Sequence, residues 1–421
     1  MDFFFALLIL FSWWTSCVLL LWLWKKPLFQ QTWREPYFAD IPVLLESDDW
    51  GPGGAFHIDR LNDLLNTLKQ YSDSQGRHPV LTANMVLAVP DIEKIQADTK
   101  RYHRLLLDQG FPALTQAFQS AAKDGAFVPQ LHGMEHLNGE ALTHLRNIAD
   151  PRTDEAFSQP GWWDWESLDS PLQGHYVDGS SLPTQPIDPA QASTIIKMAA
   201  EYFERLFGTA SYSTVAPCYL WNGEVESLWF QHGIKSIQTA GYRCTGRDSQ
   251  GHYHQDKPLI RPGEQSDDGH IYLARNVMFE PTDGRTNADT AWQESRAAIA
   301  QALPVTISSH RYNFTRSEPE HRDSLAGLKT LLSKLSGLGQ VRFLSSPELA
   351  QAIAKPSAEL NNPFATELSP PLLTLRGWPK IAAYLYRLRY RHPKLKAVAL
   401  LTGLALPILL IQALAGRRIK A

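Results

Sequence analysis

Two histidines four positions apart mark the stretch Gln130-Leu131-His132-Gly133-Met134-Glu135-His136, which follows the apolar run Phe127-Val128-Pro129. A helix that begins near Gly133 would place both imidazoles on one side of its first turn, because side chains at i and i+4 lie over one another. Neutral imidazole is the commonest protein metal ligand, so the pair would offer two corners of a metal site. Such pairs are also ordinary on protein surfaces, and this one needs support from elsewhere in the chain.

That support comes from the stretch Leu44-Leu45-Glu46-Ser47-Asp48-Asp49-Trp50-Gly51, where two adjacent carboxylates end an apolar run. One carboxylate could complete a metal site while the other stays free for proton transfer. The alternative is a turn with a capping aspartate, because turns favour Asp and Gly. The aspartates alone do not decide between these interpretations.

The chain of 421 residues, 44% hydrophobic and 20% charged, is long enough for one large core. Its cysteines, Cys17, Cys218 and Cys244, form no CxxC pair, so disulfides do not organise the fold. Strand-like and helix-like segments alternate from residue 42 to residue 344, which is typical of an α/β domain. The expected strands cover residues 42–46, 79–89, 127–131, 214–220, 234–239, 271–279, 304–309 and 341–344. Seven or eight strands with helices between them predict a distorted (β/α) barrel of the glycoside hydrolase/deacetylase type.

The ionisable residues of interest follow the ends of these expected strands. Asp48 and Asp49 follow one strand, His132 and His136 another, and His310 a late one. Catalytic groups of (β/α) barrels collect at the C-terminal ends of the strands. Five such residues from three distant segments therefore indicate an active site more strongly than either pair does. Residues 150–189 and 244–270 are expected to be long polar loops, the first with Trp162, Trp163 and Trp165 as possible sugar-stacking groups or buried anchors.

Two uncharged runs flank the barrel. Phe3–Trp24 has 22 residues, long enough to cross a bilayer as a helix, and Ala397–Gly416 has 20. A cleaved signal peptide is the rival for the first run, but no Lys or Arg precedes it and no small-x-small site follows. We therefore expect an N-terminal transmembrane anchor in residues 1–26, the barrel in 40–355, and a basic interfacial segment followed by a C-terminal transmembrane helix in 376–421.

Charge is distributed unevenly in a chain of net charge −3, since ten basic residues and no acidic one follow Glu367. A basic tail beside an apolar run favours an anionic membrane leaflet as its partner over nucleic acid. Lys25, Lys26 and Arg34 follow the first run, and more cations precede the second run than follow it. By the positive-inside rule residues 25–396 are cytoplasmic, which predicts a bacterial inner-membrane protein.

The order Asp-Asp, His-x-x-x-His and a late lone His resembles the polysaccharide deacetylases (carbohydrate esterase family 4, the NodB-homology fold). The segments Glu46–Gly51, Leu81–Asn84 and Gln130–Asn138 resemble a membrane-anchored bacterial branch of that superfamily. The resemblance covers about residues 40–350. It implies a distorted (β/α) barrel holding one divalent metal ion, with Zn²⁺ expected.

The resemblance also implies roles for individual residues. Asp49, His132 and His136 would bind the metal, Asp48 would be the general base and His310 the general acid. The Arg-Pro motif of the family is replaced here by Val215-Ala216-Pro217, and Arg275 is the expected substitute for its arginine. The family's fourth motif, an Asp with a Trp, is not recognisable. Trp50 and Tyr219 are candidates for binding substrate or supporting the site.

The implied function is that of a metal-dependent amidohydrolase, a hydrolase of carbon–nitrogen bonds other than peptide bonds. It would remove an N-acetyl or N-formyl group from an amino sugar in a lipid-linked glycan or cell-surface polysaccharide. One alternative is a glycoside hydrolase on the same barrel, which needs two carboxylates facing the substrate, Asp48 and Glu135. Another is a catalytically silent membrane-bound barrel that binds glycans.

Overall fold

The computed structural model describes residues 2–36, 38, 40–158, 165, 168–354, 378–392 and 394–415. Trp162 and Trp163 lie outside the described residues, as do the basic residues 376, 417, 418 and 420. The chain divides into two units, of which the larger contains residues 42–294 and 305–354. The smaller contains residues 1–41, 295–304 and 355–421.

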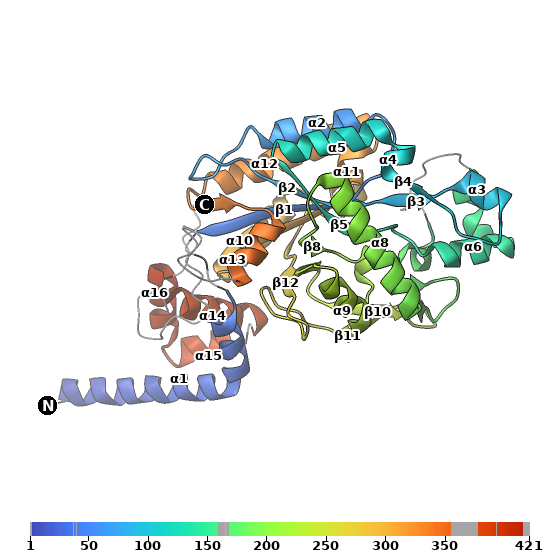
Figure 1. Cartoon of the computed structure of the whole chain (residues 1–421). Helices are drawn as coiled ribbons and strands as arrows, with labels where there is room; N and C mark the ends of the chain where they lie inside the picture. The colour runs from blue at the N-terminus through green and yellow to red at the C-terminus, as the bar shows by residue number, and fades with distance from the viewer. Residues whose placement is uncertain are drawn as a thin grey trace. The chain divides into compact units, whose positions relative to one another are not determined.

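A nine-stranded sheet forms the centre of the larger unit, in the order β12-β9-β8-β5-β2-β1-β14-β13 with β15 paired to β1 (Figure 1). Every pairing along this path is parallel. The strands are β1 (Ile41–Trp50), β2 (Leu81–Val86), β5 (Phe127–Gly133), β8 (Ser213–Thr214), β9 (Ser236–Thr239), β12 (Ile271–Ala274), β13 (Val277–Met278), β14 (Val305–His310) and β15 (Val341–Phe343). Because parallel strands are covered on both faces, β1 and β2 are buried along their whole length.

The two edges of this sheet are joined by the chain itself. β12 and β13 occupy opposite ends of the path, yet only Arg275 and Asn276 separate them in sequence. The Arg275 N–H donates to Thr239 O of β9 (2.8 Å), and the Asn276 N–H donates to Thr306 O of β14 (3.3 Å). The sheet is therefore a distorted barrel whose seam lies at these two residues. The predicted fold class is confirmed, while the strand expected over 271–279 is broken in two at the seam.

Helices connect successive strands of the barrel. They are α2 (His57–Leu68), α3 (Ile92–Ala97), α4 (Leu107–Gly110), α5 (Pro112–Lys123), α6 (Gly139–Asn147), α7 (Asp154–Ser158), α8 (Pro189–Phe207), α9 (Gly223–Gln231), α10 (Ala288–Ala300), α11 (Tyr312–Thr315), α12 (Glu318–Ser336) and α13 (Ser346–Ala354). α2 packs between α5 and α12 along one side of the sheet (Figure 1). α8 shows why such segments are helical, because Asp188 caps its first N–H groups, proline occupies its first turn and Gly208 ends it in the left-handed conformation.

Three local expectations are wrong. Residues 134–138 form an irregular loop, so no helix begins near Gly133. The next helix begins at Gly139, where Asn138 accepts a hydrogen bond from the N–H of Ala141. The strand expected over 214–220 is two residues of β8 followed by a 3-10 turn at Pro217–Tyr219. The polar loop 244–270 contains a hairpin of β10 (Arg243–Arg247) and β11 (Tyr253–Lys257). Smaller two-stranded sheets pair β3 (Ala88–Pro90) with β4 (Arg104–Leu106), and β6 (Val177–Asp178) with β7 (Gln185–Pro186).

The smaller unit contains α1 (Asp2–Arg34), α14 (Trp378–Arg391), α15 (Leu395–Leu401) and α16 (Ala405–Ala415). The helical dihedrals of α1 are interrupted at Lys25, two residues before Pro27. Among the described helices, α1 alone is long and apolar enough to cross a membrane, over Phe4–Arg34, and a signal sequence would meet the same criteria.

The C-terminal segments differ from the sequence-based expectation. The apolar run that begins at Ala397 is divided between α15 and α16, with Gly403 in the left-handed conformation between them. The 11 residues of α16 span about 17 Å at 1.5 Å per residue, which is short of the roughly 30 Å of a bilayer core. In α14 the Arg387 guanidinium is buried in an ion pair with Glu35 of α1 (2.5 Å), and Tyr384 packs on Leu28. Both side chains are buried within the smaller unit.

Candidate metal centre and active site

Three buried side chains meet at one point of the barrel. The Oδ1 atom of Asp49 lies 3.3 Å from His132 Nε2 and 3.2 Å from His136 Nε2. All three residues are less than 10% exposed, and they form the one group of potential metal ligands found among the described residues. The structure thus brings together the three ligands expected from the sequence.

An irregularity in β1 allows both aspartates to face this site. Neighbouring residues of a regular strand point to opposite faces, which would separate Asp48 from Asp49. The pairing of β1 with β2 shifts register between Ser47 and Trp50, and Asp49 has a left-handed backbone with φ 68°. This bulge turns the Asp49 carboxylate toward the histidines, as bulges at barrel rims commonly re-aim a side chain.

Gly133 has a similar role between the two histidines. Its φ of 136° is one that residues with a side chain rarely adopt, and an added Cβ would lie 2.8 Å from Glu135 O. The chain therefore turns sharply at the end of β5, so that His132 at the strand end and His136 in the loop both reach Asp49. The ligands converge through a glycine turn and not through one helical face.

The protonation of the cluster fits a bound cation. His132 Nδ1 is 2.8 Å from Val215 O, a carbonyl oxygen that can only accept, so Nδ1 donates and the ring is held with Nε2 toward Asp49. Burial lowers the pKa of His136 to about 4, although Asp49 opposes the shift, so His136 is neutral at pH 7. Burial alone would raise the pKa of Asp49, but the two histidines lower it below its usual value, so the carboxylate is ionised.

The spacing of the three atoms fits as well. Two ligand atoms about 2.1 Å from one ion at a tetrahedral angle lie about 3.4 Å apart. The two distances from Asp49 Oδ1 are close to that value. Two imidazoles and one carboxylate leave a fourth position open, which is the ligand arrangement of catalytic zinc sites.

Asp48, next to these ligands, has a different set of partners. Its Oδ2 accepts from Arg275 Nη1 (2.6 Å), and its Oδ1 accepts from Arg275 Nη2 and Asn84 Nδ2 (both 2.7 Å). Burial works to raise the pKa of Asp48, but the Arg275 guanidinium outweighs it and lowers the pKa below its usual value. Asp48 is thus an ionised carboxylate whose orientation is set by an arginine from the barrel seam. This is the contact expected of Arg275.

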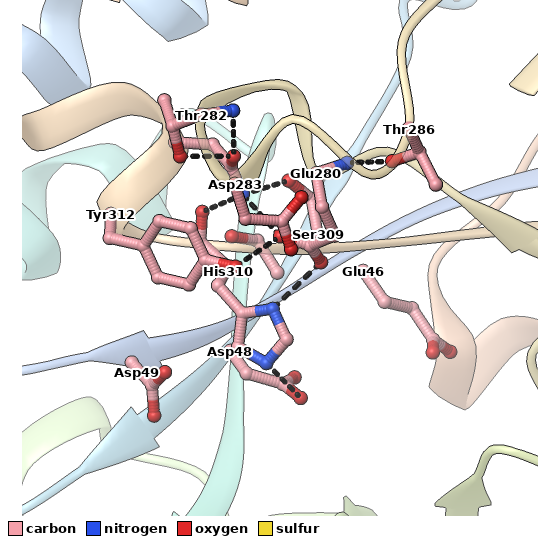
Figure 2. Close-up of polar contacts among 12 residues, drawn as sticks. Glu46, Asp48, Asp49, Glu280, Thr282, Asp283, Thr286, Ser309, His310 and Tyr312 are labelled. Carbon is pink, nitrogen blue, oxygen red and sulfur yellow. Dashed lines mark hydrogen bonds and ion pairs between the residues drawn. The ribbon is translucent and has the colours of Figure 1, made fainter. Parts of the chain in front are cut away.

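His310 lies close to Asp48 (Figure 2). Its Nε2 is 3.9 Å from Asp48 Oδ2, and its Nδ1 is 2.7 Å from Glu280 Oε1. The second Glu280 oxygen accepts from Tyr312 Oη (2.8 Å) and Asn313 Nδ2 (2.5 Å). Burial disfavours the imidazolium, but the Glu280 carboxylate raises the pKa of His310 to about 10. His310 is therefore cationic at pH 7, with Nε2 directed into the site.

Tyr219 and Trp50 differ in their relation to the site. The Tyr219 hydroxyl accepts from Arg275 Nη1 (2.9 Å), and its backbone is left-handed with φ 55°, so a strained turn presents it beside the arginine. Trp50 is fully buried, edge-on to Phe118 and Phe127, with its Nε1 donating to Ser47 Oγ. Trp50 supports the end of β1 from the core, and the substrate contact considered for it is wrong. Trp165 stacks on His136 with ring centroids 6.0 Å apart.

Glu135 has partners of its own, Arg104 and His175. Its Oε1 accepts from Arg104 Nε (2.5 Å), and it lines a separate cavity of about 370 Å³ with Tyr102 and His175. A glycosidase needs two carboxylates on either side of one bond. Asp48 is not among the residues that line that cavity, so the structure gives this alternative no support.

Sequence reasoning missed Glu280, Glu46 and Asn84. Met278 pairs with Ser308 in the parallel ladder of β13 and β14, which places residue 280 opposite residue 310. Glu46 and Asn84 lie in segments that had been noted as motifs, and the alternation of side chains along β1 puts Glu46 on the face of Asp48. The alternation of side chains along β1 could have identified Glu46 from the sequence. No sequence feature indicated that β13 pairs with β14, so Glu280 could not have been identified in this way.

Comparisons with known proteins give weak similarities in structure. No protein-family model and no curated protein matches the sequence. Among solved structures, a family 4 carbohydrate esterase from Streptomyces lividans is 13% identical with a TM-score of 0.34, over 74% of this chain and 95% of that one. The peptidoglycan deacetylase PdaC from Bacillus subtilis is 14% identical with a TM-score of 0.36, over 75% and 92%.

A 4-alpha-glucanotransferase from Thermococcus litoralis is 8% identical with a TM-score of 0.38, over 74% of this chain and 40% of that one. Fold alone does not give function.

Proposed function

We propose that the chain is a metal-dependent amidohydrolase that removes an N-acyl group from an amino sugar. The observation that carries the proposal is the convergence of Asp49, His132 and His136 next to Asp48 and His310. The cluster has the ligands of a catalytic divalent-metal site, and zinc suits the two imidazoles best. Asp48 and His310 are an ionised carboxylate and a protonated imidazole, the two groups that hydrolysis of an amide requires.

The chain's own residues divide the reaction between them. A divalent ion, when bound, polarises the amide carbonyl and lowers the pKa of water. The Asp48 carboxylate accepts a proton from the attacking water as the new carbon–oxygen bond forms. His310 donates the Nε2 proton to the amide nitrogen as the carbon–nitrogen bond breaks, and Glu280 keeps this histidine charged and oriented. The products are the carboxylic acid and the free amine of the sugar.

We also propose that the substrate is a lipid-linked glycan or a cell-surface polysaccharide precursor carrying an acetyl or formyl group. The support is the long apolar helix α1, which would hold the enzyme at a membrane. Tethering raises the effective concentration of a lipid-carried substrate without any added contact.

The function is tested by measuring metal content and acyl release together. Full-length protein purified in detergent should contain about one divalent ion and release acetate or formate from N-acylated amino-sugar oligomers. A chelator should abolish release, and Zn²⁺ should restore it. The variant with both His132→Ala and His136→Ala should lack metal and activity. Bound metal without release from any such glycan would favour the silent, glycan-binding barrel.

The cytoplasmic location of residues 25–396 remains a proposal from the basic residues after α1. Reporter fusions after Arg34 and before Trp378 should both report the cytoplasm. A cysteine introduced at His252, whose side chain is 73% exposed, should resist an impermeant thiol reagent in intact cells. Labelling from outside would reverse the orientation and favour a substrate in the exported glycan.

A further inference from the structure

Arg275 is held between two carboxylates in the barrel interior. Its Nε donates to Glu46 Oε2 (2.7 Å), on the edge of the guanidinium away from the two N–H groups that hold Asp48. The side chains of Arg275 and Glu46 have no exposed surface, and that of Asp48 is 4% exposed. Because the guanidinium is a rigid planar fork, a contact at Nε sets the direction of both Nη groups.

Glu46 is itself anchored to the elements next to β1. Its Oε1 accepts from Ser346 Oγ (2.5 Å), and the Ser346 N–H donates to Thr82 Oγ1 (3.0 Å). The carboxylate therefore joins β1 to the start of α13 and to β2. In β1, Glu46 and Asp48 are two residues apart and point to the same face, so one arginine can contact both.

The buried Nε–H of Arg275 also needs a hydrogen-bond acceptor. With Glu46 removed, its Nε–H would lose its acceptor in a site without solvent, which costs about 1–3 kcal/mol. Arg275 stands at the seam between β12 and β13, directly after the last residue of β12. Its orientation then depends on side-chain contacts.

We infer that Glu46 is a positioning residue, which holds the Arg275 guanidinium so that the Asp48 carboxylate faces the attacking water. This role rests on the proposed hydrolase function. The hydrogen bonds and ion pairs of Glu46 are made with Arg275 and Ser346. None of them involves one of the three proposed metal ligands. Its removal should therefore affect the catalytic step and not metal binding.

The test is a double-mutant cycle on kcat and KM. Glu46→Leu should lower kcat about 100-fold, the usual effect of a misplaced catalytic group, with KM within about twofold and metal content unchanged. Glu46→Gln keeps a carbonyl oxygen for Arg275 Nε and should retain kcat within about tenfold of wild type. In an Arg275→Met background, Glu46→Leu should cause no further loss, because there is no guanidinium to position. Independent, multiplicative losses would overturn the inference.

A matched control is Glu226→Leu. Glu226 is also buried and accepts from Arg243 Nη1 (2.9 Å), but its arginine does not contact Asp48. This variant should lose stability while its kcat stays near wild type. An equal loss of kcat in both variants would show a general effect of destabilisation and overturn the positioning role.

A second readout does not depend on activity. In the Glu46→Leu protein the Arg275 Nε–H, followed by ¹⁵N NMR, should exchange with solvent at least about tenfold faster than in Glu226→Leu. Equal exchange rates would overturn the inference even if no substrate is ever hydrolysed. Lack of acyl release by the wild type, with the faster exchange observed, would instead contradict the proposed function alone.

Discussion

Asp48 and Asp49 are neighbours on one strand and equally buried, yet their carboxylates have opposite surroundings. Asp48 is surrounded by donors, with Arg275 and Asn84 satisfying both of its oxygens. The Asp49 Oδ1 atom faces two imidazole nitrogens, His132 Nε2 and His136 Nε2. The protein itself thus supplies a positive charge to Asp48, from Arg275, whereas the partners of Asp49 are two imidazoles. We propose that this difference separates a general base from a metal ligand.

The largest effect should follow from breaking the Asp49 side. His136→Ala removes one of three ligands and should reduce bound metal to background and hydrolysis by three orders of magnitude or more, because the electrophile is worth several kcal/mol. Metal analysis and acyl release measure the two losses. Glu280→Gln is the control, since it alters a residue outside the cluster and should keep its metal. Stoichiometric metal in His136→Ala would remove the distinction between the two aspartates.

A smaller loss should follow from breaking the Asp48 side. Asp48→Asn should retain metal but lower kcat by about 10²–10³, because an amide oxygen does not take up the proton. Leaving Arg275 with one carboxylate partner fewer should also lower the melting temperature, which a thermal scan would show. If Asp48→Asn loses metal while Asp49→Asn keeps it, the two roles are the reverse of those proposed.

The smallest expected effect concerns His310, whose positive charge is balanced by the Glu280 carboxylate. In metal-free protein its pKa of about 10 is above the ordinary 6.5, so the folded state binds its proton more tightly than the unfolded state. The resulting stabilisation is fully present below pH 6.5 and is lost as the pH rises through about 10. Glu280→Gln removes the main attraction, so the stability gap to wild type should be largest near pH 6 and close toward pH 10. Urea unfolding of chelated protein measures this gap, and a gap that widens with pH would contradict the assignment.

Much of the site could be predicted from the sequence because its groups are local. Asp48 with Asp49, and His132 with His136, are each within five residues, and each pair follows a strand of clear hydrophobic pattern. The late His310 stands at the end of another such strand. Alternation of strands and helices predicted a barrel, and strand ends of a barrel meet at one rim. The candidate ligands could therefore be named without coordinates.

The contacts of these site residues depend on structural features that the neighbouring sequence does not indicate. The bulge at Asp49 and the turn at Gly133 replaced the helical face expected for the histidines, because backbone strain at a functional site is maintained by its tertiary contacts. For the same reason the apolar character of Trp50 indicated burial without showing on which side of the strand it would lie.

The sequence by itself determined the α/β class, the two apolar runs and the candidate metal ligands, because hydrophobic period and short spacings are properties of neighbouring residues. Only the tertiary structure decided which charges face one another. Glu280 meets His310 through the register of β13 on β14, and Arg275 meets Glu46 and Asp48 because the chain crosses the barrel seam at that residue. Strand register and barrel closure are set by packing over the whole barrel. Glu280 is 30 residues from His310, and no local pattern in the sequence indicates that the two side chains meet.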